Sequence, residues 1–126
     1  MEFNHIAITV RNLEESIAFY TKFFGFTSDG SHEKPNGPRF CFLKRDSIRL
    51  ELFEFKDPIP PEDSQTNLRV IGLRHIAFKV KDIKGIVAQL QKDGLPFDPI
   101  RGGTSCKYFA FATDPNGVSI ELYEAN

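Results

Sequence analysis

Residues 5–10 (HIAITV) and residues 75–80 (HIAFKV) are nearly identical and lie 70 positions apart (75 − 5). A second pair of segments has the same offset: residues 50–54 (LELFE) and residues 120–124 (IELYE). Each half therefore carries a histidine followed by a glutamate 46 positions later (51 − 5 and 121 − 75). Similarity at a fixed spacing indicates an internal duplication. It predicts equivalent places in two halves for four polar residues: His5, Glu51, His75 and Glu121.

The composition excludes several classes of function. The chain has 126 residues, 16 basic and 17 acidic side chains, and a net charge of −1, which does not favour binding to nucleic acid. No apolar run reaches membrane-spanning length, and the N-terminus lacks a signal-peptide pattern, so we expect a cytoplasmic protein with no membrane partner. Two isolated cysteines, Cys41 and Cys106, predict buried free thiols rather than a disulfide framework or a zinc site.

The first half has the pattern strand–helix–strand–strand–strand. A strand-like alternation over 2–10 is followed by Asn12 in the N-cap position and Glu15 in the capping-box position. An apolar stripe at helical spacing follows, and Gly25 is expected to end the helix. Further strands are expected at 26–32, 39–44 and 47–55.

The second half follows the same plan after a polar, proline-rich segment, 57–69, which is interpreted as a linker. A strand is expected at 73–80, and Asp82 and Gly94 are expected to begin and end a helix. Further strands are expected near 97–101 and at 106–113 and 118–124, with a flexible loop at 101–104. The expected α+β domain spans 1–126, with modules 1–56 and 70–126.

Side chains alternate between the two faces of a strand, so sequence parity assigns each residue to a face. The four repeated His and Glu residues fall opposite the aliphatic face that can pack on a helix, beside small or aromatic residues. This pattern is typical of a concave sheet that lines a pocket rather than of a solvated face. Glu54 and Glu124 have the other parity and are interpreted as surface charges at the strand ends, and His32 as a surface residue.

Imidazole nitrogen and carboxylate oxygen are a common mixed ligand set for divalent first-row metals. A single strand histidine is more often a hydrogen-bonded structural group, and a single glutamate usually faces solvent. Burying four such groups without a cation is costly, because each buried carboxylate needs a partner. Their equivalent placement in two repeats therefore favours one shared metal ion.

These residues, together with 16–20 (SIAFY), 24–26 (FGF) and 114–122 (DPNGVSIEL), resemble the vicinal oxygen chelate superfamily. The superfamily includes glyoxalase I, methylmalonyl-CoA epimerase, extradiol dioxygenases and fosfomycin-resistance enzymes. The resemblance implies two βαβββ modules whose sheets form a cleft around one divalent ion (Ni, Co, Mn, Zn or Fe), often in a homodimer. It assigns the metal positions to His5, Glu51, His75 and Glu121, and leaves open whether the modules pair within one chain or across a dimer.

In glyoxalase I, a glutamate at the metal moves a proton between adjacent carbons through an enediolate. By resemblance, Glu121 is the expected acid/base and Glu51 its possible partner, in a lyase or isomerase acting on a small oxygenated substrate. Thr9 and Phe55 occupy the positions where glyoxalase I holds glutathione with Arg and Asn, so a different substrate is expected. The candidate substrate-binding residues are Thr9, Phe40, Phe42, Arg49, Phe53, Lys79 and Tyr123, with Arg101 and Lys107 as further candidates for an anionic group.

Three alternatives remain open at this stage. An iron(II) extradiol dioxygenase would need only His5, His75 and Glu121, which leaves Glu51 without a role. A fosfomycin-type transferase raises the same difficulty. A bleomycin-type binding protein would need no metal, and such binders usually lack the ligands that this sequence retains.

Overall fold

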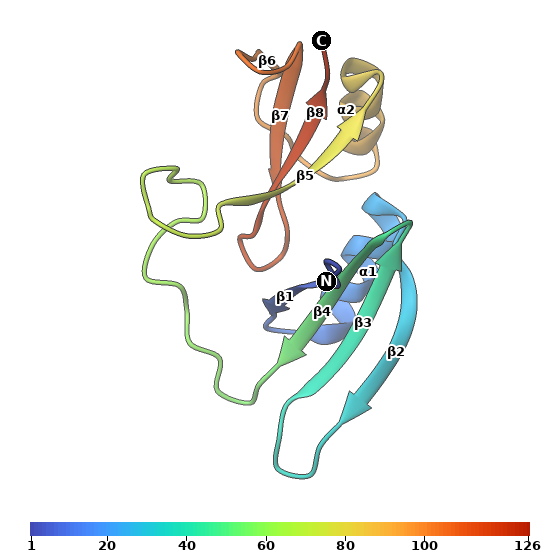
Figure 1. The fold of residues 1–126 in the computed structure, drawn as a ribbon, viewed down its shortest axis with the longest axis vertical. Coiled ribbons are helices and arrows are strands. Elements are labelled where there is room, and N and C mark those ends of the chain that lie inside the picture. Colours follow the sequence, from blue (N-terminus) through green and yellow to red (C-terminus); the bar gives the residue numbers. More distant parts are fainter. The chain divides into compact units, whose positions relative to one another are not determined.

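The order strand–helix–strand–strand–strand occurs twice along the chain (Figure 1). The computed structural model describes residues 1–126, which divide into one unit from Met1 to Pro60 and another from Pro61 to Asn126. The elements of the first unit are β1 (Ile6–Thr9), α1 (Leu13–Phe24), β2 (Thr27–Glu33), β3 (Arg39–Arg45) and β4 (Ile48–Glu54). Those of the second are β5 (His75–Val80), α2 (Ile83–Lys92), β6 (Arg101–Gly102), β7 (Tyr108–Thr113) and β8 (Ser119–Glu124). The predicted α+β architecture of two βαβββ modules is confirmed.

Each unit contains one four-stranded sheet, with strand orders β1-β4-β3-β2 and β5-β8-β7-β6. The first and last strands of each unit are neighbours and run parallel, whereas the hairpin strands pair antiparallel. The register places Ala7 opposite Glu51 and Ala77 opposite Glu121. This parallel pairing brings together residues that are 44 positions apart in the sequence (51 − 7 and 121 − 77).

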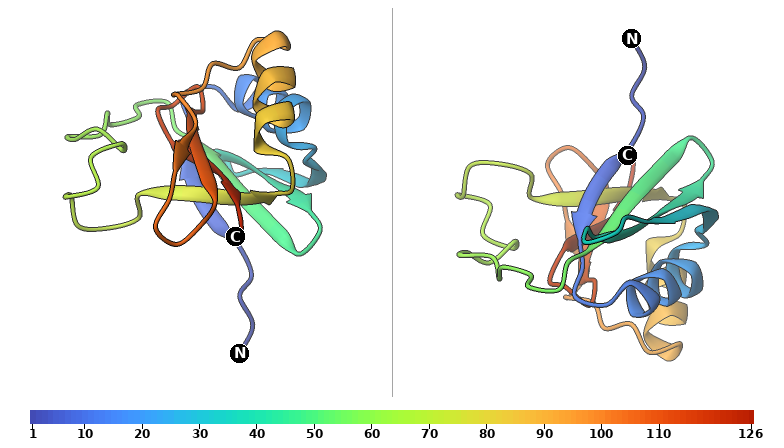
Figure 2. Two further views of the ribbon diagram at one scale, coloured as in Figure 1. Left: turned by 90° about the horizontal axis from the view of Figure 1, so that it is seen from above. Right: turned by 90° about the horizontal axis from the view of Figure 1, so that it is seen from below.

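Both helices begin at side-chain caps. The Asn12 Oδ1 accepts a hydrogen bond from the Glu15 backbone N–H at 2.8 Å, and the Asp82 Oδ1 accepts one from the Gly85 N–H at 3.0 Å. The chain leaves α1 at Gly25, whose φ of +66° is in the left-handed region that glycine adopts without strain. α1 packs on β3 and β4, and α2 packs on β7 and β8 (Figure 2).

The core of each unit lies between the helix and the aliphatic face of its sheet. Leu50 and Leu52 of β4 are fully buried. In β8, Ile120 is fully buried and Leu122 is 2% exposed. Their neighbours Glu51 and Glu121 are on the opposite face, as strand parity predicted. Cys41 and Cys106 are buried free thiols, which confirms that prediction, and burial raises the pKa of Cys41.

Glu54 and Glu124 are not the surface charges that the sequence suggested. The Glu54 Oε2 accepts a hydrogen bond from the Leu13 N–H at 2.7 Å, and the Glu124 Oε2 accepts one from the Ile83 N–H at 2.9 Å. Each carboxylate thus satisfies a free N–H in the first turn of a helix and lies at the positive end of the helix dipole. The last strand of each unit therefore holds the helix at its N-terminus.

Each of these carboxylates also has a cationic partner. The Arg39 guanidinium bonds both Glu54, at 2.8 Å, and Glu14, at 2.7 Å. The Lys107 ammonium lies 3.0 Å from Glu124. Arg39 in turn holds the pKa of Glu14 below its ordinary value.

A change of Glu124 to glutamine is expected to alter the acid sensitivity of the fold. The Ile83 N–H, and after it the Lys107 ammonium, hold the pKa of Glu124 below its usual 4.5. A depressed folded-state pKa stabilises the fold above the unfolded value, and this contribution is lost as pH falls through the folded value. Thermal denaturation should therefore show Glu124→Gln with a lower Tm than wild type near neutral pH, and a difference that shrinks as pH falls below 4.5.

The matched control for that experiment is Glu62→Gln, which changes an exposed glutamate between β4 and β5. Its Tm should follow that of the wild type at every pH. A Tm difference for Glu124→Gln that does not change with pH would contradict the helix-capping role of this carboxylate.

Most strand ends differ from the prediction by one or two residues, and two strands, β6 and β1, differ by more. The strand expected near 97–101 is reduced to Arg101 and Gly102, which fall in the segment expected to be a loop. Pro96 and Pro99 explain this difference, because proline has no N–H to donate to a ladder. The preceding Asp98 N–H does bond the Phe111 carbonyl at 2.9 Å, but no regular strand forms there. β1 begins at Ile6, later than the alternation from residue 2 suggested.

The stretch from residue 55 to residue 74 contains no helix or strand. Its apolar side chains are largely exposed, with Ile59 at 91% and Ile71 at 100%. Neither α1 nor α2 has the length and apolar character that a membrane-spanning helix requires.

Candidate metal centre

His5 and Glu51 are in direct contact in the first unit, and His75 and Glu121 are in direct contact in the second. The His5 Nε2 lies 3.0 Å from the Glu51 Oε2, and the His75 Nε2 lies 3.2 Å from the Glu121 Oε2. The glutamate side chains are 15% and 14% exposed and the histidines 35% and 31% exposed. The sequence repeat is therefore also a repeat of side-chain geometry.

The parallel ladder explains why these side chains meet. Ala7 is the direct neighbour of Glu51 on β4, and Ala77 is the direct neighbour of Glu121 on β8. Each histidine lies two residues before its alanine and so projects from the same face of the sheet. Because alanine is small, the imidazole can reach the carboxylate across it.

A phenylalanine on the neighbouring strand packs against the histidine of each His–Glu pair. Phe42 of β3 is opposite Glu51, and its ring centroid lies 5.5 Å from that of His5. Phe111 of β7 is opposite Glu121, and its ring centroid lies 5.3 Å from that of His75. Both rings meet the imidazole edge to face, at interplanar angles of 80° and 72°.

Phe111 was missed in the sequence because the second hairpin is one residue longer than the first. Phe42 precedes Glu51 by nine positions, whereas Phe111 precedes Glu121 by ten (51 − 42 and 121 − 111). A fixed offset of 70 therefore points to Ala112, which faces the core. Aligning the two hairpins from the turn at residues 114–117 would have found Phe111.

The two pairs fit a divalent cation by donor type and by spacing. Two ligand atoms, each about 2.1 Å from a first-row ion and at a right angle, lie about 3.0 Å apart. The nitrogen–oxygen distances of 3.0 Å and 3.2 Å in the two His–Glu pairs match this separation between neighbouring ligand atoms. In addition, the His75 Nδ1 is buried without a hydrogen-bond partner, so the Nε2 at Glu121 makes the one polar contact of this ring. Neither unit by itself gathers three or more ligand-type side chains.

An aromatic row extends from the first pair along the same face of the sheet. The Phe40 centroid lies 6.5 Å from that of Phe42 and 5.5 Å from that of Phe53. Phe53 stacks on Phe55 at 6.2 Å. The row brings together Phe40, Phe42 and Phe53, which the sequence placed among the substrate-binding candidates. The exposed His32 also packs on Phe40, with centroids 5.1 Å apart.

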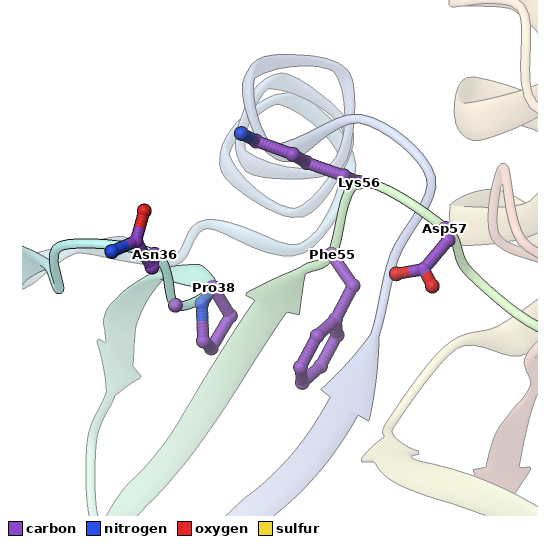
Figure 3. Close-up of a pocket in the computed structure, with 6 residues that line it drawn as sticks. Asn36, Pro38, Phe55, Lys56 and Asp57 are labelled. Carbon is purple, nitrogen blue, oxygen red and sulfur yellow. The ribbon is translucent and has the colours of Figure 1, made fainter.

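A pocket of about 250 Å³ lies at the end of this row and is lined by residues 36–38 and 55–57. Figure 3 shows the Phe55 ring just past the end of β4 and Pro38 just before the start of β3. Phe55 is 42% exposed. The pocket thus offers an apolar ring together with the charged residues Lys56 and Asp57.

The other substrate-binding candidates differ in their surroundings. Thr9 and Lys79 are exposed on their strands, whereas the Tyr123 hydroxyl donates a hydrogen bond to the Ser105 carbonyl at 2.8 Å. The charge of Arg49 is paired with Asp29 at 2.7 Å, and that of Lys107 with Glu124. Arg101 is exposed in β6.

Comparison with known proteins identifies the family. A family model described as the Glyoxalase/Bleomycin resistance protein/Dioxygenase superfamily matches residues 2–122. The chain belongs to this superfamily. An uncharacterized protein of Bacillus subtilis, YwkD, is 36% identical over 124 residues, covering 96% of this chain and 94% of YwkD.

Two further similar proteins extend the comparison. The mitochondrial methylmalonyl-CoA epimerase of Dictyostelium discoideum is 29% identical over 127 residues, covering 96% of this chain and 76% of the epimerase. The crystal structure of the glyoxalase family protein from Enterococcus faecalis matches with a TM-score of 0.82 and 31% identity, covering 98% of this chain and 97% of that chain. The likeness therefore spans both units.

Proposed function

We propose that this protein is a metal-dependent enzyme of the lyase or isomerase type that acts on a small oxygenated substrate. The observation that carries the proposal is the repeated His–Glu contact, at 3.0 Å in one unit and 3.2 Å in the other, in equivalent register positions. Similarity to an epimerase supports the choice of a proton-transfer reaction.

Each unit supplies two ligand-type side chains, which is fewer than a divalent first-row ion takes. We therefore infer that the two units form one domain in which His5, Glu51, His75 and Glu121 hold a single ion. The pairing of the units within one chain, or between two chains of a homodimer, provides the same ligand set. Ni, Co, Mn, Zn and Fe are all compatible with imidazole and carboxylate donors.

A divalent ion at this site would stabilise negative charge that develops on a substrate oxygen. Glu121 is the proposed acid/base: its carboxylate accepts a proton from a carbon of the substrate and returns it to the neighbouring carbon. Glu51, in the equivalent place of the first unit, is its partner. The low exposure of both carboxylates, 15% and 14%, limits proton exchange with water.

The aromatic row favours a substrate whose polar head meets the His–Glu pairs and whose body is apolar. Phe40, Phe42 and Phe53 offer ring faces and edges rather than hydrogen-bond donors along the first sheet. Thr9 and Phe55 carry no positive charge for a glutathione carboxylate. We therefore propose a substrate other than the glutathione hemithioacetal.

Titration with Ni²⁺, Co²⁺, Mn²⁺ or Zn²⁺ is expected to show binding of about one ion per chain. His5→Ala and His75→Ala should each weaken this binding at least about 100-fold, because each removes one ligand of the shared ion. Isothermal titration calorimetry with metal analysis of the purified protein provides the measurement. The matched control is His32→Ala, which changes the remaining histidine, on β2, and should leave metal binding unchanged.

Binding of less than about 0.1 equivalent of every ion tested would overturn the metalloenzyme proposal. The metal-loaded protein should then be screened with α-hydroxy ketones, adducts of 2-oxoaldehydes with thiols, and catechols. Oxygen-dependent consumption of a catechol with Fe²⁺ would support an extradiol dioxygenase instead. Tight binding of a small molecule without turnover would support a sequestering protein.

A further inference from the structure

Asn4 lies between His5 and Arg49 and contacts both. Its Oδ1 is 2.7 Å from the His5 Nδ1 and 3.4 Å from the Arg49 Nη1. The Arg49 guanidinium has two further contacts, one with a carboxylate and one with an aromatic ring. Its Nε donates a hydrogen bond to the Asp29 carboxylate at 2.7 Å, and its guanidinium carbon lies 4.0 Å from the centroid of the Phe42 ring.

The donors and acceptors in the series of contacts from Arg49 through Asn4 to His5 indicate which nitrogen of His5 carries a proton. Arginine only donates, so the Asn4 atom that faces it must be the amide oxygen. An amide oxygen only accepts, so the His5 Nδ1 must be the donor in the 2.7 Å contact. When the imidazole is neutral it has one N–H, so the His5 Nε2 carries the lone pair; only a protonated ring has a second N–H to give to Glu51.

The lone pair of Nε2 faces another acceptor. The Glu51 Oε2 is 3.0 Å away, and an ionised carboxylate has no proton to donate. Two acceptors at this distance repel each other unless a positive centre lies between them. A proton on Nε2 supplies that centre in the imidazolium, and a divalent ion supplies it when the ring is neutral; metal-bound histidines commonly donate their other ring N–H to an oxygen in this way.

The second unit lacks an equivalent arrangement. Arg74 occupies the place of Asn4, 70 positions later, and its guanidinium bonds the backbone carbonyls of Gly72 and Asn67. The His75 Nδ1 is buried without a hydrogen-bond partner. The contacts that orient the histidine are therefore present in the first unit alone.

We propose that Asn4 and Arg49 are positioning residues that hold His5 in its Nδ1–H tautomer, with the Nε2 lone pair directed at the metal ion. The inference rests on the proposed metal site and adds that the two His–Glu pairs are oriented in different ways. The first pair, His5 and Glu51, is oriented before the ion arrives. The second pair, His75 and Glu121, is oriented by binding the ion.

The tautomer can be measured in the metal-free protein by ¹⁵N NMR of the histidine side chains at alkaline pH, where a protonated ring does not mask it. In the wild type we expect the His5 Nδ1 to show the shift of a protonated ring nitrogen and the Nε2 that of an unprotonated one. In Asn4→Ala the proton should move to Nε2, from which it can be donated to Glu51. A wild-type His5 with its proton on Nε2 would overturn the inference, whether or not the protein binds metal.

The second measurement is the affinity for Zn²⁺ by competition with a chelating indicator. Asn4→Ala should weaken binding about 10–100-fold, the usual effect of removing a hydrogen-bond partner of a metal-bound histidine. Asn4→Asp keeps the acceptor oxygen and should retain most of the affinity. Arg49→Lys should weaken binding less than Asn4→Ala, because His5 keeps its direct partner.

Arg74→Ala changes the equivalent residue of the second unit and is the matched control, expected to bind Zn²⁺ as the wild type does. Equal weakening by Asn4→Ala and Arg74→Ala, or no weakening by Asn4→Ala, would overturn the inference. Circular dichroism checks that each variant is folded. Absence of Zn²⁺ binding by the wild type would refute the proposed function instead, and the tautomer measurement would still decide the role of Asn4.

Discussion

Replacing Glu121 with glutamine is expected to lower kcat about 10²–10⁴-fold, the range that general acid–base catalysis supplies. Glutamine keeps the size of the side chain and an oxygen that can bind a cation, but it cannot take a proton from carbon. The loss should therefore be one of turnover more than of substrate binding. The measurement is steady-state kinetics of the metal-loaded variant on a substrate identified by the screen.

Glu51→Gln is the matched control, because Glu51 has the same contact with a histidine in the first unit. Its kcat should fall less than that of Glu121→Gln. The metal content of both variants must be measured, so that loss of the ion is distinguished from loss of the base. Undiminished activity of Glu121→Gln at full metal occupancy would show that this carboxylate is not the acid/base. A larger loss in Glu51→Gln would exchange the two roles.

Truncating a core leucine on the helix side of either sheet is expected to lower the free energy of unfolding by about 2–5 kcal/mol. Leu52 of β4 and Leu122 of β8 occupy equivalent places and are 0% and 2% exposed. Leu52→Ala and Leu122→Ala each remove buried methyl groups and leave a cavity against the helix. Urea denaturation followed by circular dichroism gives the free energies.

The two leucine variants also test whether the units form one domain. If they do, each variant should shift a single transition of the whole chain, and the shifts should be similar. Two separated transitions, with one variant moving only one of them, would show that the units unfold independently and would contradict a shared metal site in one domain. Leu68→Ala changes an exposed side chain in the stretch between β4 and β5 and should alter stability by less than about 0.5 kcal/mol.

Much of the fold follows from local signals in the sequence. Asn12 and Asp82 act as helix caps through their own short side chains, so residues within three positions are enough to predict them. The faces of β4 and β8 follow from alternation alone, because one strand places Leu50 and Glu51 on opposite sides whatever its neighbours are. The repeat then assigned the His and Glu residues to one face of each unit.

The errors and omissions arise where distant segments meet. Parity put Glu54 and Glu124 on the helix face, but it did not show that a helix N-terminus 41 positions earlier lies over each carboxylate. Phe111 was hidden by one additional residue in a hairpin. Asn4 belongs to no motif, and its contact with Arg49 spans 45 positions. Pairings of this kind depend on how the sheet closes, which no short window of sequence contains.

The alternation along β4 and β8 also bears on how such a chain can evolve. Residues that hold the fold, such as Leu50 and Leu52, are interleaved one by one with residues on the opposite face of the sheet, such as Glu51 and Phe53. Selection can therefore exchange the second set while the first is kept. A duplicated scaffold of this kind can acquire new substrates through single substitutions, and its two copies can diverge in chemistry while remaining alike in shape.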